Sequence, residues 1–182
     1  MINKKGQMEM SMGTIVTIVL LVTLLVLGVV LIKNIMGGAT NVVDLTNAQL
    51  ENEVNKLFST DSKIAVYPGT REVKLKQETN GGIGFGIKNL QTGTATSGKF
   101  SYLVSAADVG NCGITKEVAN TWIILGKAES DIAIPIGDNT IRKVIFNIPS
   151  GAPLCMLTYK IEVKVGTAIY ASDSFQVEIK AK

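Results

Sequence analysis

The sequence contains no histidine among its 182 residues and only two cysteines, Cys112 and Cys155. Without histidine, the chain has no imidazole for acid–base catalysis at neutral pH, and most protein zinc sites are excluded. The two cysteines are 43 positions apart, so they form neither a Cys-x-x-Cys redox pair nor a cysteine-rich metal site. We therefore expect a protein that is not an enzyme and that needs no cofactor or metal.

Charged residues are also scarce, and neither sign dominates. They make up 18% of the chain, with 18 cations interspersed among 15 anions. The basic cluster with interleaved aromatic residues that nucleic-acid binding requires is missing, so we expect no nucleic-acid partner. Hydrophobic residues make up 46% of the chain, and its mean hydropathy of +0.30 is high for a water-soluble protein.

This excess hydrophobicity is concentrated in residues 10–32, which are 23 consecutive residues without a charge. As an α-helix they would be about 34 Å long, enough to cross a hydrocarbon core of about 30 Å. Lys4 and Lys5 precede the run and Lys33 follows it, which favours a cytoplasmic N-terminus and an extracellular C-terminal domain. The remaining residues, about 150, suffice for one domain with its own core.

The residues alone allow two interpretations of this run. It is either an uncleaved single-pass membrane anchor or a secretory signal peptide cut after Ala39, where Gly37 and Ala39 supply a small-x-small site. The apolar part of a signal peptide is typically about 7–15 residues long, so the longer run here favours the anchor.

The residues before the run suggest a third interpretation. They read Lys4-Lys5-Gly6-Gln7-Met8-Glu9-Met10-Ser11. A basic pair, Gly-Gln and a long apolar helix together resemble the class III leader of archaeal type IV pilin-like and archaellin-like surface proteins. The resemblance implies a leader of residues 1–6, which a prepilin peptidase cuts between Gly6 and Gln7. It also implies that the helix is kept and packs in the core of a filament.

The acidic residue of the leader departs from the family pattern. Many members carry a glutamate at the fifth position after the cut, thought to pair with the N-terminal amine of a neighbouring subunit. That position is Ser11 here, and the nearby acid is Glu9. We expect Glu9 either to take the subunit-pairing role or simply to stabilise the start of the helix through the helix dipole.

A second helix is expected beyond Gly37-Gly38, which interrupts the helical pattern. In residues 41–58 one helical face carries Val43, Leu50, Val54 and Leu57. We therefore divide this part into a hydrophobic helix, residues 7–36, and an amphipathic helical stalk, residues 37–63. The apolar stripe packs either on the following domain or on the helix of a neighbour.

From residue 64 onward the sequence is typical of an antiparallel β-sandwich. Polar and apolar residues alternate in several short runs, as expected for strands with one face in water. The runs do not alternate with helices as in βαβ units, so residues 64–182 are expected to form an immunoglobulin-like sandwich. With the helices that precede this sandwich, the expected fold class is α+β. The predicted strands are residues 64–67, 72–77, 82–90, 99–105, 122–125, 132–136, 141–148, 156–165 and 169–180.

The glycine-rich stretch at residues 80–86 is interpreted as structural. It matches neither the Gly-x-Gly-x-x-Gly spacing nor a Walker motif, so it does not indicate phosphate binding. Asn80-Gly81 is a turn signal, and the glycines that alternate with Ile83 and Phe85 suit a strand that another segment approaches closely.

Cys112 and Cys155 are expected to form a disulfide if the domain lies outside the cytoplasm. In the chain-entropy model, closing this loop contributes roughly 3–4 kcal/mol to stability. The alternative is two buried free thiols.

Together these patterns predict a structural subunit of an archaeal pilus-like filament on the cell surface. Its expected partners are the membrane, a prepilin peptidase and other copies of the chain, bound through the hydrophobic helix. The alternative is a single-span anchored sandwich that acts as a binding or adhesion module and does not polymerise. No pattern in the sequence indicates a ligand for the domain.

Overall fold

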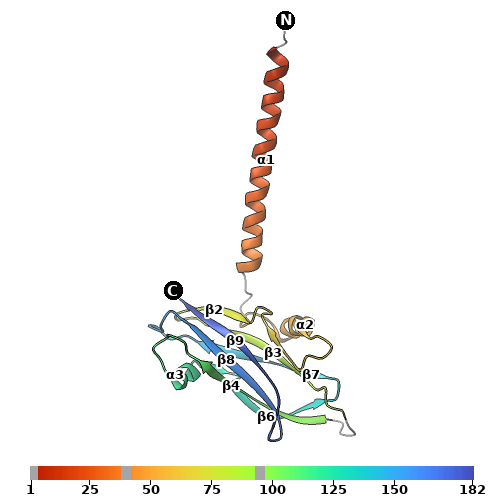
Figure 1. Ribbon diagram of the computed structural model, residues 1–182, viewed down its shortest axis with the longest axis vertical. Coiled ribbons are helices and arrows are strands. Elements are labelled where there is room, and N and C mark those ends of the chain that lie inside the picture. The colour runs from red at the N-terminus through yellow and green to blue at the C-terminus, as the bar shows by residue number, and fades with distance from the viewer. Residues whose placement is uncertain (1–3, 38–41, 93–96) are drawn as a thin grey trace. The chain divides into compact units, whose positions relative to one another are not determined.

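The computed structural model describes residues 4–37, 42–92 and 97–182 and divides the chain into two compact units. The first, Met1–Ala39, contains helix α1 (Lys4–Gly37). The second, Thr40–Lys182, is named the β domain here. Among its described residues it holds two short helices and nine strands (Figure 1).

Between Gly13 and Val30, helix α1 exposes apolar side chains on every side. Between Gly13 and Val30 none of the side chains is buried, and Leu24 and Leu25 are 64% and 67% exposed. The Thr17 hydroxyl donates to the Gly13 carbonyl at 2.5 Å, and Thr23 donates to Leu20 at 2.8 Å, so these polar groups are satisfied within the helix. By length and composition α1 would cross a membrane, although a signal sequence near the N-terminus would meet the same test.

The strands of the β domain form two sheets. The four-stranded sheet has the order β1 (Ile64–Tyr67), β3 (Asn80–Lys88), β7 (Asn139–Asn147), β5 (Ile123–Leu125). The five-stranded sheet has the order β2 (Glu72–Lys76), β9 (Ala168–Lys180), β8 (Met156–Val165), β4 (Ser97–Asp108), β6 (Ala128–Pro135). Each predicted strand corresponds to one of these, with ends that differ by up to four residues.

One strand pairing differs from the expected antiparallel arrangement. Strand β2 runs parallel to β9, with Glu72 opposite Gln176 and Lys76 opposite Lys180. The two strands are far apart in the chain and no hairpin joins them, so chain connectivity does not force an antiparallel pair. The described ladders of the other neighbouring strands are antiparallel.

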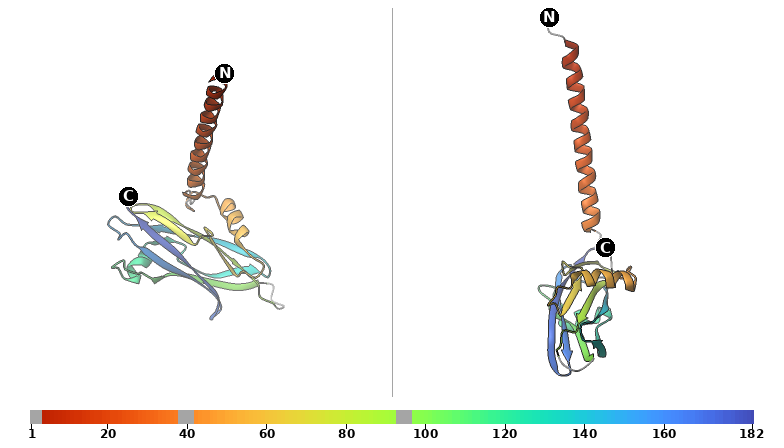
Figure 2. Two further views of the ribbon diagram at one scale, coloured as in Figure 1. Left: turned by 45° about the horizontal axis from the view of Figure 1, so that its top comes forward. Right: turned by 90° about the vertical axis from the view of Figure 1, so that its right-hand side faces the viewer.

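The two sheets share one core, and Figure 2 shows them as two layers. Aromatic rings join the layers: Phe85 of β3 meets Tyr102 of β4 with ring centroids 4.9 Å apart, and Phe146 of β7 meets Tyr159 of β8 at 4.9 Å. Alternation along β8 explains this layering. Its apolar residues at every second position are fully buried in the core: Leu157, Tyr159, Ile161 and Val163.

The outer face of the five-stranded sheet carries interleaved charges. Glu162 pairs with Lys160 at 2.8 Å and with Lys164 at 3.1 Å, and hydrogen bonds from these two lysines hold the pKa of Glu162 below its ordinary value. Glu178 pairs with Lys74 at 3.8 Å and also with Lys180. On this solvent-facing surface each of the two glutamates therefore pairs with two lysines.

The outer face of the four-stranded sheet is covered by helix α2 (Asn47–Leu57). A Cβ at Gly84 would lie 2.3 Å from Leu50 Cδ1, and one at Gly86 would lie 2.8 Å from Val54 Cγ1. The glycines of β3 thus make room for the helix, as the close-approach interpretation predicted. The apolar stripe packs on the domain itself, so α2 belongs to the β domain rather than to a separate stalk.

Helix α2 is shorter than predicted because it begins at a cap. Thr46 forms a capping box with Gln49, and the residues just before it make a turn. The predicted helical face therefore loses its first member: Val43 is 41% exposed, whereas Val42 is 1% exposed and packs with Leu50 and Val54.

Helix α3 (Lys116–Thr121) was not predicted, because six residues are too few for a clear helical period. Its local signals are Thr115, which caps the first turn, and the acidic Glu117 within that turn. The predicted disulfide is confirmed: Cys112, in the loop before α3, is bonded to Cys155, which directly precedes β8.

Candidate functional site

The predicted processing residues lie at the start of α1. Gly6, Gln7 and Glu9 all fall within the helix, which begins at Lys4, so the Gly6–Gln7 peptide bond has a helical conformation. Lys4 and Lys5 occupy the positive end of the helix dipole, where cations are disfavoured. Residues 1–3 of the leader and the Gly38 and Ala39 positions lie outside the described residues. Cleavage and the subunit-pairing role of Glu9 stay predictions.

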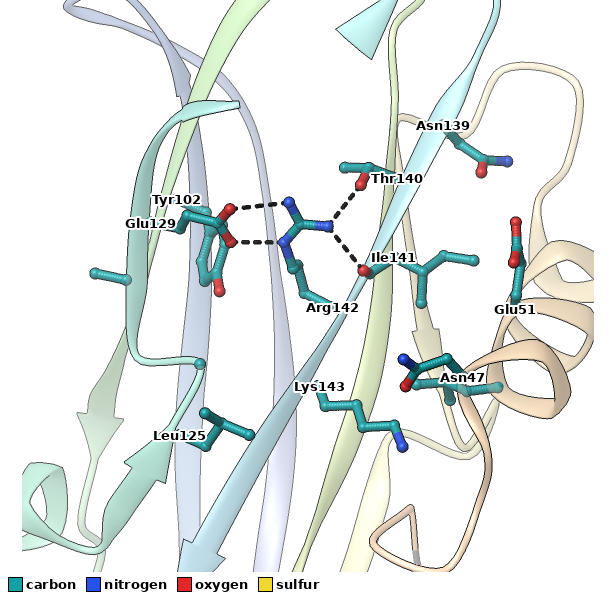
Figure 3. Close-up of a pocket in the computed structure, with 13 residues that line it drawn as sticks. Asn47, Glu51, Tyr102, Leu125, Glu129, Asn139, Thr140, Ile141, Arg142 and Lys143 are labelled. Carbon is teal, nitrogen blue, oxygen red and sulfur yellow. Dashed lines mark hydrogen bonds and ion pairs between the residues drawn. The ribbon is translucent and has the colours of Figure 1, made fainter. Parts of the chain in front are cut away.

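A groove of about 730 Å³ lies on the open side of the β domain (Figure 3). Strand β7 runs along it, with α2 on one side and the segment from β5 to β6 on the other. Its position follows from the shortness of β5, which pairs only with Ile145 and Phe146 of β7. From Asn139 to Lys143, β7 therefore has β3 on one side and no described strand on the other.

This edge of β7 is capped by other parts of the domain. The Arg142 Nη1 group donates to the Ile141 carbonyl at 3.0 Å and to the Thr140 hydroxyl at 2.7 Å. Gly126, with φ of +75°, lies so close to Lys143 that a Cβ on it would be 1.9 Å from the Lys143 carbonyl oxygen. Two carbonyls of the edge are therefore covered without a neighbouring strand, which limits edge-to-edge association.

An ion pair bridges the two sheets across the groove. Arg142 of β7 donates to Glu129 of β6 through Nε at 2.6 Å and Nη2 at 2.9 Å, a bidentate geometry that Figure 3 shows. The hydrogen bond from Arg142 lowers the pKa of Glu129, and the same bond raises the pKa of Arg142. The pair therefore joins the two sheets at an edge where none of the described strands pairs with this part of β7.

Tyr102 forms the floor of the groove beneath this ion pair. The residue is 5% exposed, and its ring packs edge-on against Phe85. Its hydroxyl makes no hydrogen bond with any residue that the structure describes, and it is not sealed from the groove. Burial, reinforced by the Glu129 charge, raises the pKa of Tyr102, so the hydroxyl keeps its proton and remains a donor at neutral pH.

Polar side chains surround the mouth of the groove. Asn47 and Glu51 come from α2, and Asn139 and Lys143 from β7 (Figure 3). Asn139 donates to Asn55 of α2 at 2.9 Å, and Lys143 donates to the Leu45 carbonyl in the turn before α2 at 2.5 Å. Among the described residues there is no group of three or more side chains suited to hold a metal ion.

Sequence reasoning did not find this groove. Glu129 and Arg142 lie on different strands of different sheets, and Tyr102 lies on a third strand. Tyr102 follows the same alternation as the core residues of β4, so no local pattern shows that its hydroxyl reaches a groove. Only the pairing of the strands brings the three residues together.

Comparisons with known proteins leave the family open. No family model matches the chain, and no curated protein matches it. A PapD-like domain of human CEP192 superposes with a TM-score of 0.42 at 9% identity, covering 69% of this chain and 93% of that one. The Pseudomonas fluorescens alkylpurine DNA glycosylase AlkC gives 0.33 at 11% identity, covering 64% of this chain and 31% of that one.

A family 123 glycoside hydrolase from Clostridium perfringens gives a TM-score of 0.35 at 14% identity, covering 61% of this chain and 23% of that one. Similarities of this size assign neither a family nor a function to the chain.

Proposed function

We propose that the protein is a structural subunit of an archaeal pilus-like surface filament, assembled through helix α1. The observation that carries the proposal is that α1 has no charged residue between Gly13 and Val30, and that none of these mostly apolar side chains is buried. A helix that is apolar all round is stable in lipid or inside a bundle of similar helices, but not alone in water. The Lys4-Lys5-Gly6-Gln7 sequence supports the proposal as well, because cleavage after Gly6 would allow the helix to move from the membrane into a bundle of similar helices.

In this proposal the β domain is the part that the helix carries outside the cell. Its two sheets around one core suit an immunoglobulin-like sandwich. The Cys112–Cys155 disulfide suits an oxidising compartment, which agrees with an N-terminus in the cytoplasm and a C-terminal domain outside. The absence of histidine favours a structural rather than a catalytic role.

The first test is the N-terminus of the mature protein. Mass spectrometry of protein from the membrane fraction should find a chain that begins at Gln7. A chain that begins at Met1 or Ile2 would contradict processing and favour the anchored binding module. A chain that begins at Thr40 would contradict both the filament subunit and the anchored binding module, because ordinary signal peptidase would then have removed α1.

The second test is assembly. A Glu9→Ala variant should form fewer or shorter filaments in electron micrographs if Glu9 pairs with a neighbouring subunit, while Glu51→Ala, which removes an exposed acid of the β domain, should not. Unchanged filaments with Glu9→Ala would refute the pairing role of Glu9. Absence of filaments from wild-type cells that process the leader would refute the filament itself.

A further inference from the structure

The groove beside β7 holds a hydrogen-bond donor that the β domain does not use. Tyr159 donates its hydroxyl proton to the Ala119 carbonyl at 2.8 Å, and Tyr170 donates to the Lys88 carbonyl at 2.9 Å. The Tyr102 hydroxyl has no such acceptor among the described residues, although the residue is 5% exposed. None of the described residues has a buried side-chain polar atom without a partner, so the Tyr102 hydroxyl opens into the groove, where it can donate to a ligand that enters.

Other groups around the same groove also retain hydrogen-bonding capacity. The side chains of Asn47 and Glu51 bond to no described residue, and the Thr140 hydroxyl accepts from Arg142 and keeps its own proton to donate. The groove therefore offers donors and acceptors together, on different elements facing one space. The Arg142 charge at its centre is balanced by Glu129, so a ligand in contact with them needs no net charge.

An added β-strand fits this groove poorly. Along an antiparallel strand, backbone groups of alternate residues face the same side, and Asn147 N–H donates to Trp122 of the β5 side. Ile141 and Lys143 therefore face the groove, but their carbonyls are covered by Arg142 and Gly126. A peptide strand would meet two blocked acceptors in succession, whereas a ligand with separate polar groups does not depend on this ladder.

We propose that the groove is a binding site for a neutral oligosaccharide, with Tyr102 donating a hydrogen bond to it from the floor. Every sugar hydroxyl both donates and accepts, which matches the mixture of a phenol, an amide, a carboxylate and a hydroxyl. The volume of about 730 Å³ lies within the range of small-molecule sites, and exposed Leu125 supplies an apolar wall. This role is additional to the filament and does not depend on assembly by α1.

The test is an array of neutral oligosaccharides built from hexoses and N-acetylhexosamines, probed with the full-length protein. The protein is kept in lauryldimethylamine oxide, because a detergent with a sugar headgroup would compete for the groove. The best oligosaccharide on the array is then titrated by calorimetry. We expect saturable binding that Tyr102→Phe weakens by about 3–10-fold, the effect of one lost neutral hydrogen bond.

Two matched pairs of variants separate the groove from general effects on folding. Tyr159→Phe removes a hydroxyl that is bonded inside the domain, so it should leave sugar affinity unchanged. Ala128→Trp places a large ring in the groove and should abolish binding, whereas Ala133→Trp, on an exposed position of the same strand outside the groove, should not. Trp122 fluorescence verifies that Tyr102→Phe and Tyr159→Phe remain folded.

Three results would overturn the proposal. One is the absence of binding to every neutral oligosaccharide on the array. The second is binding that Tyr102→Phe and Ala128→Trp leave unchanged. The third is binding of a synthetic strand peptide with the sequence of residues 156–165 that Ala128→Trp blocks, which would make the groove a strand-addition site instead.

Discussion

Helix α1 and the β domain arrange their apolar side chains in opposite ways. In α1 the leucines between Gly13 and Val30 point outward, and Leu24 is 64% exposed. In the β domain the largest apolar side chains point inward, and Phe85 and Phe146 are 0% and 1% exposed. The domain therefore satisfies the hydrophobic effect by itself, whereas α1 needs an apolar environment supplied by lipid or by other chains. The second unit has a hydrophobic core of its own, whereas none of the side chains between Gly13 and Val30 of the first is buried.

The largest expected effect comes from deleting an apolar side chain in each region. Phe146→Ala removes a ring that contacts Tyr159 and Phe175 and should lower the free energy of unfolding of the β domain by about 3–5 kcal/mol. Leu24→Ala in α1 should leave it unchanged. Urea unfolding followed by the fluorescence of Trp122, the single tryptophan, measures the domain alone. Similar losses in both variants would mean that α1 packs stably on the domain.

Removing the disulfide should have the next largest effect. A Cys112→Ser, Cys155→Ser double variant lacks the bond that joins the loop before α3 to β8 and should lose about 3–4 kcal/mol of domain stability. Reduction of the wild-type protein with dithiothreitol should reproduce this loss in the same unfolding experiment. If the reduced protein and the double variant are as stable as the oxidised protein, the bond does not stabilise the domain.

Replacing a glycine by alanine should destabilise the β domain but not α1, with a smaller effect than the two changes above. Gly84→Ala forces a Cβ against Leu50 and should weaken the packing of α2 on the sheet by about 1–3 kcal/mol. Gly28→Ala in α1 meets nothing within 4 Å and should leave domain unfolding unchanged while increasing the helicity of α1. Amide hydrogen exchange of α2 tests the first effect, and equal protection in Gly84→Ala and wild type would contradict it.

The smallest effect concerns the ion pair that bridges the sheets. Arg142 lowers the pKa of Glu129 in the folded state, so the pair stabilises the domain above the ordinary carboxylate pKa and is lost as the pH falls through the lowered one. Because the Glu129 side chain is 41% exposed, Glu129→Gln should cost only about 0.2–1 kcal/mol at pH 7. The difference from wild type should shrink as the pH falls through the lowered pKa and vanish below it. A difference that persists there would mean that the charge of Glu129 is not responsible.

Strand positions could be predicted because their alternation is local. In β8, every second side chain enters the core, and the sequence alone shows this period. The start of α2 and the face that it buries were predicted less accurately than the strands, because the start of a helix depends on its cap. Thr46 and Gln49 set that start, which replaced Val43 by Val42 on the buried side. The parallel pairing of β2 with β9 was also beyond reach, since it joins distant segments.

The candidate site was still less predictable. The groove depends on Tyr102, Glu129 and Arg142, which come from three strands in two sheets. None of the three belongs to a motif with fixed spacing. The glycines of β3 were the exception, because a run of alternating glycines signals close approach before the approaching segment is known.

The sequence by itself determined the apolar helix, the strand-rich domain and the two cysteines available for a bond. These properties depend on composition and on periods of a few residues, which neighbouring positions establish without help from the rest of the chain. Only the tertiary structure decided that α2 belongs to the domain and that no described strand pairs with β7 beyond the short β5. It also placed an unused tyrosine hydroxyl in the resulting groove. Those features depend on contacts between segments far apart in the chain, and such contacts leave no local period in the sequence.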